Sequence, residues 1–193
     1  MKRILVAAAA VALAVAAGSA AAAAAAAARV SSGFAAAPVS LHLGLYRGVL
    51  IAHSAWRWVV IIAGFAAVVS PMMRLSRQEA WTPVGPQLAR FFGIAIDIQV
   101  LMGAALYLLL SPLTTIVLST AGMKLPPGSQ AHFFVVTHPA IMIVAFIAVH
   151  VSSVVVRRAR SDAAHQRRAI IFYGVTLLIV LAGIPWWRPL LRF

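Results

Sequence analysis

The sequence predicts an all-α fold: a polytopic membrane protein built as a four-helix up-down transmembrane bundle, preceded by an N-terminal signal peptide or an extra first helix. The first observation is composition, because 63% of the 193 residues are hydrophobic and only 10% are charged, against about 25% charged in soluble domains. The second is that four segments each reach the roughly 20 apolar residues that a membrane span requires. The third is that these segments are too long for strands and lack strand-like alternation. The lipid bilayer is therefore the expected environment.

The N-terminus carries the pattern of an export signal. A Met-Lys-Arg start precedes a run of Ala, Val and Leu, and this order is typical of a secretory signal peptide. We predict such a peptide for residues 1–28, with an uncleaved N-terminal helix as the alternative, because the run is also long enough to span a membrane. Residues 29–41 are then expected to be an exported flexible segment, and residues 42–193 to form the transmembrane domain.

The four predicted spans are joined by short connections, which favours an up-down arrangement. The spans cover about 43–70, 88–110, 133–156 and 169–187. Pro71 and the pair Ser111-Pro112 are expected to end the first two spans, because proline disrupts a helix interior. Trp186 and Trp187 follow the apolar part of the fourth span, where they suit the headgroup level of the membrane.

Basic residues are distributed unevenly over the predicted loops. The connection between the first two spans contains Arg74, Arg77 and Arg90, and five arginines lie between the third and fourth spans, whereas the remaining loop has Lys124. Cytoplasmic loops are enriched in Lys and Arg. This predicts a multi-pass protein of the bacterial inner (cytoplasmic) membrane with its mature N- and C-termini in the periplasm. Since the positive charges fall at the ends of spans, the formal net charge of +13 indicates topology and not nucleic-acid binding.

Cysteine is absent from the chain. This excludes disulfides, thiolate metal sites and covalent c-type haem attachment, so a redox cofactor would be held non-covalently or through His, Met or carboxylate side chains. The sequence also contains no hydrolase, kinase or nucleotide-binding signature. It leaves open whether the protein is an enzyme, and it favours an electron-transfer or accessory protein over a stand-alone enzyme.

Ionisable residues inside the predicted spans are the candidate functional residues, because such residues are rare in membranes and usually face the bundle interior. They are His53, Arg57, Asp97 and His150. His53 and Arg57 share one stripe of the first span, which we expect to face inward. Arg57 and Asp97 each lie roughly 20 Å from the outer end of their span. Their matching depths predict a buried ion pair, in which opposite charges offset each other's desolvation, either to fix helix register or to take part in chemistry.

Two registers are possible for the histidines of the third span. If the helix begins with the Thr-His-Pro sequence around His138, as proline in a first turn favours, His42 matches His138 in depth and His53 matches His150. If the helix begins near Phe133, His138 falls near the level of His53, and His150 is left unpaired near the cytoplasm. The sequence alone supports both registers.

Paired histidines at one depth on facing helices are what a non-covalent b-type haem requires. The iron takes one imidazole from each side, and the apolar bundle holds the macrocycle. The candidate ligands are His53, His138, His150 and His42. Arg57 is placed to pair with a haem propionate. The alternatives are a direct metal site of His53, Asp97 and His138, and histidines that only hydrogen-bond to their surroundings.

A family of small four-helix bacterial membrane proteins, labelled cytochrome b-like, resembles this chain in four stretches: AHSAWRWVV, DIQVLMGAALYLLLSP, THPAIMIVAFIAVHV and IIFYGVTLLIVLAGIPWW. The family pattern falls on His53 and Arg57 in the first span, on Asp97 and Gln99 in the second, and on His138 at the start of the third. Many members have histidine where this chain has Asp97. The resemblance covers roughly residues 50–187 and implies a four-helix fold that binds haem.

Three functions follow from these patterns. The first is a small b-type cytochrome that transfers electrons within a respiratory or redox assembly. The second is a cofactor-free structural accessory subunit of a larger membrane complex, in which the polar residues form interhelical hydrogen bonds. The third is a proton or ion relay through the intramembrane charges. All three place the protein in the bilayer beside other membrane subunits.

Overall fold

The structure, a computed structural model, describes residues 39–120 and 123–188. The signal peptide or first helix predicted for residues 1–28 lies outside the described residues, as does the predicted flexible segment up to residue 38. From Tyr46 onward the chain forms one structural unit, and this unit contains the candidate site.

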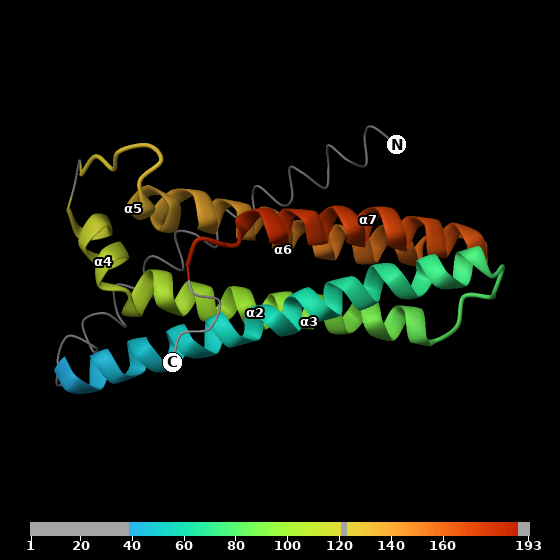
Figure 1. The fold of residues 1–193 in the computed structure, drawn as a ribbon, viewed down its shortest axis with the longest axis horizontal. Coiled ribbons are helices and arrows are strands. Elements are labelled where there is room, and N and C mark those ends of the chain that lie inside the picture. The colour runs from blue at the N-terminus through green and yellow to red at the C-terminus, as the bar shows by residue number, and fades with distance from the viewer. Residues whose placement is uncertain (1–38, 121–122, 189–193) are drawn as a thin grey trace. The chain divides into compact units, whose positions relative to one another are not determined.

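Four long helical segments make up most of the described chain (Figure 1). The elements in chain order are α2 (Val39–Ser76), α3 (Val84–Ala105), the π-helix η1 (Leu106–Leu110), α4 (Pro112–Ser119), α5 (Gln130–His132), the π-helix η2 (Phe133–Thr137), α6 (His138–Arg157) and α7 (Asp162–Gly183). Four stretches are long and apolar enough to cross a membrane: Leu41–Ser76, Val84–Leu110, Gln130–Arg157 and Asp162–Gly183. Residues 39–120 and 123–188 contain no strand. The prediction of an all-α chain with four potential membrane spans is therefore confirmed.

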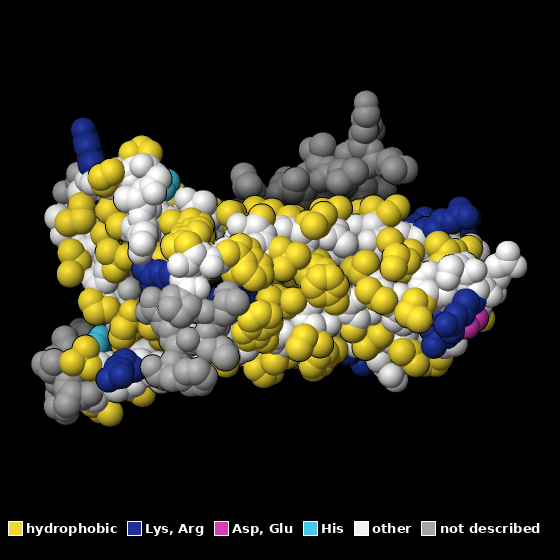
Figure 2. Space-filling view, viewed as in Figure 1, with side chains coloured by type: hydrophobic (Ala, Val, Ile, Leu, Met, Phe, Trp, Pro, Cys, Tyr) yellow, Lys and Arg dark blue, Asp and Glu magenta, His cyan; other side chains and the backbone are white. Residues whose placement is uncertain are grey.

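The surface of these helices is apolar along their length. Hydrophobic side chains cover the long sides, and Lys and Arg gather mainly near the ends (Figure 2). Ile62 on α2, Leu101 on α3 and Leu178 on α7 are each about two-thirds exposed. Soluble proteins rarely expose so much continuous apolar surface, so this surface suits lipid.

Pro71 lies inside α2, although we expected it to end the first span. A proline removes one helical hydrogen bond, and membrane helices tolerate this where neighbouring protein compensates. Pro71 is buried, so the interrupted turn faces protein. The second expected boundary is as predicted, since Ser111 caps α4 and Pro112 is its first residue.

Pro139 lies within the continuous run of α5, η2 and α6, so the third helical segment begins before it. Having no N–H, Pro139 cannot donate to the carbonyl of Val135 four residues earlier. Tyr107 of η1 supplies a donor, because its hydroxyl donates to Val135 O at 2.9 Å. An unsatisfied carbonyl in hydrocarbon is costly. The Tyr107 hydroxyl gives the Val135 carbonyl a hydrogen-bond donor, so the helical segment can contain Pro139 without this cost.

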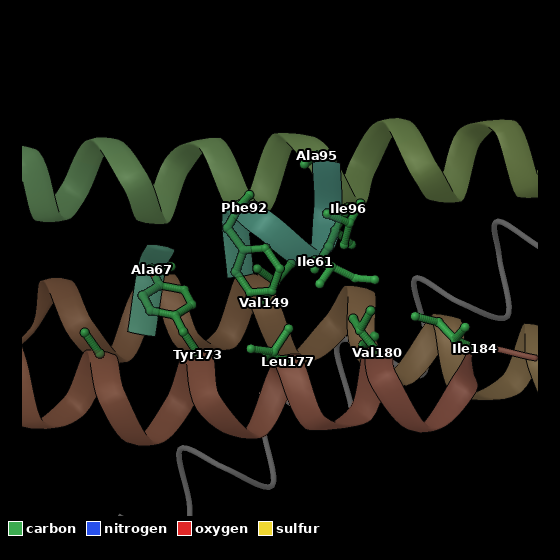
Figure 3. Packing of buried hydrophobic residues seen from close by; sticks show 14 of the residues in the cluster. Ile61, Ala67, Phe92, Ala95, Ile96, Val149, Tyr173, Leu177, Val180 and Ile184 are labelled. Atoms are coloured by element: carbon green, nitrogen blue, oxygen red, sulfur yellow. The ribbon is translucent and has the colours of Figure 1, made fainter. Parts of the chain in front are cut away.

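The hydrophobic core lies where α2, α3, α6 and α7 meet (Figure 3). Phe92 of α3 is fully buried and meets Tyr173 of α7 edge to face, with ring centroids 6.2 Å apart. Gly64 marks a close approach of α2, because a Cβ there would lie 2.7 Å from Leu177 Cδ1 and 2.9 Å from the Phe92 ring. Small residues allow such approach between membrane helices, and here they let α2 pack on α3 and α7 together.

A hydroxyl contact joins α6 to α7 beside this core. Ser152 Oγ lies 3.1 Å from Phe172 O and 3.2 Å from Thr176 Oγ1. Both hydroxyl side chains are buried, so water does not compete for these bonds. Interhelical bonds of this kind stabilise membrane helices by about 1 kcal/mol each.

The connection between α2 and α3 is attached to the beginning of α7. Gln166 Nε2 donates to Glu79 O at 2.7 Å. The ring of Trp81 stacks on His165 with centroids 5.4 Å apart. Arg74 in the last turn of α2, Arg77 of this connection and the arginines next to the start of α7 therefore lie at one end of the unit.

Substituting Gly64 with valine is expected to destabilise the unit by about 1–3 kcal/mol, because the new side chain overlaps Phe92 and Leu177 in a packed core. Thermal unfolding in detergent, followed by circular dichroism, measures the effect. Gly174→Val is the matched control, since a Cβ at Gly174 has no atom within 4 Å. Equal loss in both variants would contradict close packing at Gly64.

Candidate functional site

Two histidines from α2 and α6 meet inside the unit. The rings of His53 and His138 have centroids 6.3 Å apart and planes 82° apart. This is the second of the two registers considered above, in which His138 falls near the level of His53. This register arises because the third helical segment begins at Gln130. His138 therefore lies deeper along the segment than it would if the helix began at Pro139.

His138 is oriented by the end of α7. Its Nδ1 lies 2.8 Å from the carbonyl oxygen of Gly183, and since a carbonyl only accepts, Nδ1 carries the hydrogen. The Gly183 carbonyl is free to accept because carbonyls in the last turn of a helix lack helical donors. In a neutral imidazole the lone pair then lies on Nε2, which is the arrangement usual for a metal-ligating histidine fixed by a backbone carbonyl.

His53 is oriented by Gln99 of α3. The amide Nε2 of Gln99 donates to His53 O at 3.1 Å and lies 3.2 Å from the ring Nε2 of His53. Gly103 makes room for the ring, because a Cβ there would lie 3.3 Å from His53 Cε1. His53 Nδ1 and Gln99 Oε1 are buried, and neither has a hydrogen-bond partner among the described residues. Two such polar atoms beside one histidine are the mark of a site that can accept another group.

Aromatic rings surround the second histidine. Phe133 and Phe134 have ring centroids 5.8 Å and 6.3 Å from His138. Trp187 meets Phe133 edge to face at 4.7 Å, and Arg188 lies over Phe134 at 4.1 Å. An apolar wall with a cation at its margin suits a planar, largely apolar ligand that carries acidic groups.

Asp97 lies next to His150 of α6, with His150 Nε2 3.0 Å from Asp97 Oδ1. Its neighbours Ala95 and Gln99 hydrogen-bond to α2. Two residues correspond to about 200° around a helix, so Asp97 faces away from α2 and toward α6. The structure gives Asp97 a partner that we did not predict, and the ion pair of Asp97 with Arg57 stays a prediction.

Arg57 lies one helical turn after His53, as its spacing predicts, with its guanidinium 6.0 Å from the Trp58 ring centroid. His42 lies on α2 ahead of Tyr46, and its role as a ligand stays a prediction. His150 is taken up by Asp97 and is exposed. His53 and His138 are therefore the two predicted ligands that the described residues bring together.

The donor set suits a metal that brings ligands of its own. Within residues 39–120 and 123–188, no three His, Asp or Glu side chains gather as a bare metal ion would require. Haem iron already has four porphyrin nitrogens and needs one or two protein ligands. His53 and His138, whose ring centroids are 6.3 Å apart, are the residues that would hold such a group.

Gln99, Tyr107 and Gly183 were not recognised from the sequence as partners of the site. For Gln99 a signal existed, since an amide two residues from Asp97 in an apolar span needs a partner. Tyr107 could have been connected to the proline-interrupted segment only by knowing which helices are neighbours. The Gly183 carbonyl gives no sequence signal, because every residue has a carbonyl.

Comparison of the chain with known protein families, with curated proteins and with solved structures finds no match. The resemblance to cytochrome b-like proteins therefore stays a prediction. Fold and geometry together define a helical protein with four potential membrane spans and a half-buried two-histidine site.

Replacing Gln99 with leucine is expected to lower stability by about 1 kcal/mol, because one amide loses its interhelical bonds. Nitrogen NMR of ¹⁵N-labelled histidine should show a changed His53 ring and an unchanged His138 ring. Gln87→Leu, at an exposed position early in α3, is the control. A His53 spectrum insensitive to Gln99→Leu would contradict the described contact.

Proposed function

We propose that the protein is a small b-type cytochrome-like membrane protein, in which His53 and His138 would hold a non-covalently bound haem, and which transfers electrons within a membrane redox assembly. The observation that carries the proposal is the pair of half-buried imidazoles from α2 and α6 with centroids 6.3 Å apart. Haem held there would supply a one-electron redox centre whose potential depends on its ligands and on burial.

Each residue of the site has a separate task in this proposal. Gly183 O holds the Nδ1 hydrogen of His138 and so directs Nε2 toward the ligand; such a bond also raises the basicity of the ligating nitrogen. Gln99 contacts both the ring and the carbonyl of His53; its bond to His53 O would hold α2 beside α3 if the ring were engaged by haem. Arg57, one turn from His53, offers a cation for a propionate.

The proposed topology is an up-down bundle with both arginine-rich connections in the cytoplasm and both mature termini in the periplasm of a bacterial inner membrane. Two findings support it. The connections before α3 and before α7 lie at one end of the unit, since Gln166 bonds to Glu79 O. That end is also rich in Arg, as cytoplasmic loops are. The two-histidine site would then lie in the periplasmic half.

A cofactor-free accessory subunit is the second candidate function. It is favoured by the pair of Asp97 and His150, whose side chains are 37% and 51% exposed although they lie within potential spans. In this case His53 and Gln99 form an interhelical hydrogen bond and nothing more. The two candidates differ in whether the purified protein holds a chromophore.

Visible spectra of the purified full-length protein from haem-replete cells test the proposal. We expect Soret and α bands in the reduced state and a low-spin ferric signal by electron paramagnetic resonance. His53→Ala and His138→Ala should abolish the bands or convert the iron to high spin, because each removes one axial ligand. Circular dichroism checks that the variants remain helical.

His165→Ala is the control for these spectra, since His165 stacks on Trp81 at the far end of α7 and should leave the bands unchanged. His150→Ala distinguishes the two possible registers of the third span, and this variant should also retain the bands. A colourless wild-type protein would support the accessory subunit. Bands lost in His150→Ala and retained in His138→Ala would contradict the assigned pair.

A further inference from the structure

The pair of Asp97 and His150 lies on the outer side of α3 and α6. Its two side chains are 37% and 51% exposed, and both residues lie in the interior of potential membrane spans. Ionisable groups facing hydrocarbon are costly even when they are paired, because they lose hydration. The exposed part of this pair therefore needs a cover other than lipid tails.

The surroundings of the pair form a continuous surface, which we name the α3–α6 face. Its residues are Gly93, Ile94, Asp97, Leu101 and Ala104 on α3, and Ile143, Ile147, His150 and Val154 on α6. On α3, Ile94, Leu101 and Ala104 are exposed, and a Cβ added at Gly93 would meet no atom within 4 Å. Small residues beside a polar one allow a second helix to approach closely and to hydrogen-bond.

The other exposed faces differ from this one. In the middle of α2 the exposed large side chains are Ile62, Phe65 and Val69, and in α7 they are Ile171, Val175 and Leu178. These side chains are wholly apolar and suit lipid directly. The α3–α6 face differs from these two because it also exposes an ionisable pair.

We propose that a second copy of this chain covers the α3–α6 face, so that the protein is a homodimer in the membrane. The argument is charge self-complementarity. Asp97 and His150 are at one depth, because they are 3.0 Å apart. A two-fold axis along the membrane normal keeps depth and, at this face, places α3 of one copy opposite α6 of the other, so it brings Asp97 of one copy to His150 of the partner subunit.

Such an interface is isologous and closes with two copies, as most homo-oligomer contacts do. Each carboxylate, with two acceptor oxygens, can bind His150 of its own chain and that of its partner. Both exposed groups are thereby removed from lipid at once. The inference needs no haem, so it stands or falls separately from the proposed function.

The natural absence of cysteine allows a direct test by single-cysteine cross-linking of the full-length chain in membranes. Leu101→Cys places a thiol on the α3–α6 face, and Leu178→Cys places one at an equally exposed position on α7. Because α3 of one copy faces α6 of the partner, the two Leu101 positions lie diagonally across the interface, at a separation that a direct disulfide does not bridge. We therefore expect a bifunctional thiol reagent with a flexible spacer to convert Leu101→Cys to a species of twice the chain mass and to leave Leu178→Cys monomeric. Equal cross-linking of both, none with Leu101→Cys, or an adduct with a different polypeptide would overturn the proposal.

Changing the polar pair in the Leu101→Cys chain tests its part in the interface. Asp97→Asn is expected to weaken the dimer roughly tenfold, read as the dilution into detergent at which half of the cross-linking is lost. Combining Asp97→His with His150→Asp restores the complementarity, and dimer formation should return. An unchanged dimer in Asp97→Asn, or no recovery in the exchanged variant with helical content intact, would overturn the role of the pair.

Discussion

The constraint on which this structure depends is that hydrocarbon offers no hydrogen bonds, so each polar group inside a span must find a partner in the protein. The chain meets it between helices as well as within them. Tyr107 donates to the carbonyl that Pro139 leaves without a donor, His138 donates to the last carbonyl of α7, and Ser152 contacts Thr176. Each bond crosses from one helix to another, so satisfying the backbone also fixes which helices are neighbours.

The surroundings of His53 do not fully meet this requirement for hydrogen-bond partners. A buried ring nitrogen and the adjacent amide oxygen of Gln99 have no hydrogen-bond partner among the described residues. Uncompensated polar atoms in a buried site cost about 1–3 kcal/mol each. A ligand that engages the imidazole and rearranges the Gln99 amide would recover part of this cost. The atoms that cost free energy in this way are the ones that the proposed ligand would engage or rearrange.

The sequence predicted the spans well and the side-chain partners poorly, for a physical reason. Composition and span length are local, and so is the stripe that carries His53 and Arg57. Depth along a span could also be calculated, and it brought His53 and His138 together in one of two registers. The direction in which a side chain points around its helix could not be calculated, because it depends on which helices are neighbours. Asp97 was expected at the depth of Arg57, but the contact that it makes with His150 was not predicted.

The bond between His138 and Gly183 has a mechanical consequence. Gly183 ends α7, and the residues after it are attached to the beginning of the third segment, through the ring contact of Trp187 with Phe133 and the bond from Arg188 to Gln130 at 2.9 Å. The acceptor that orients His138 is therefore anchored to the same segment as the imidazole itself. A displacement of the chain after Gly183 would therefore act on the third segment through these two contacts and on the His138 ring through the Gly183 carbonyl, so the orientation of the imidazole is coupled to the end of α7.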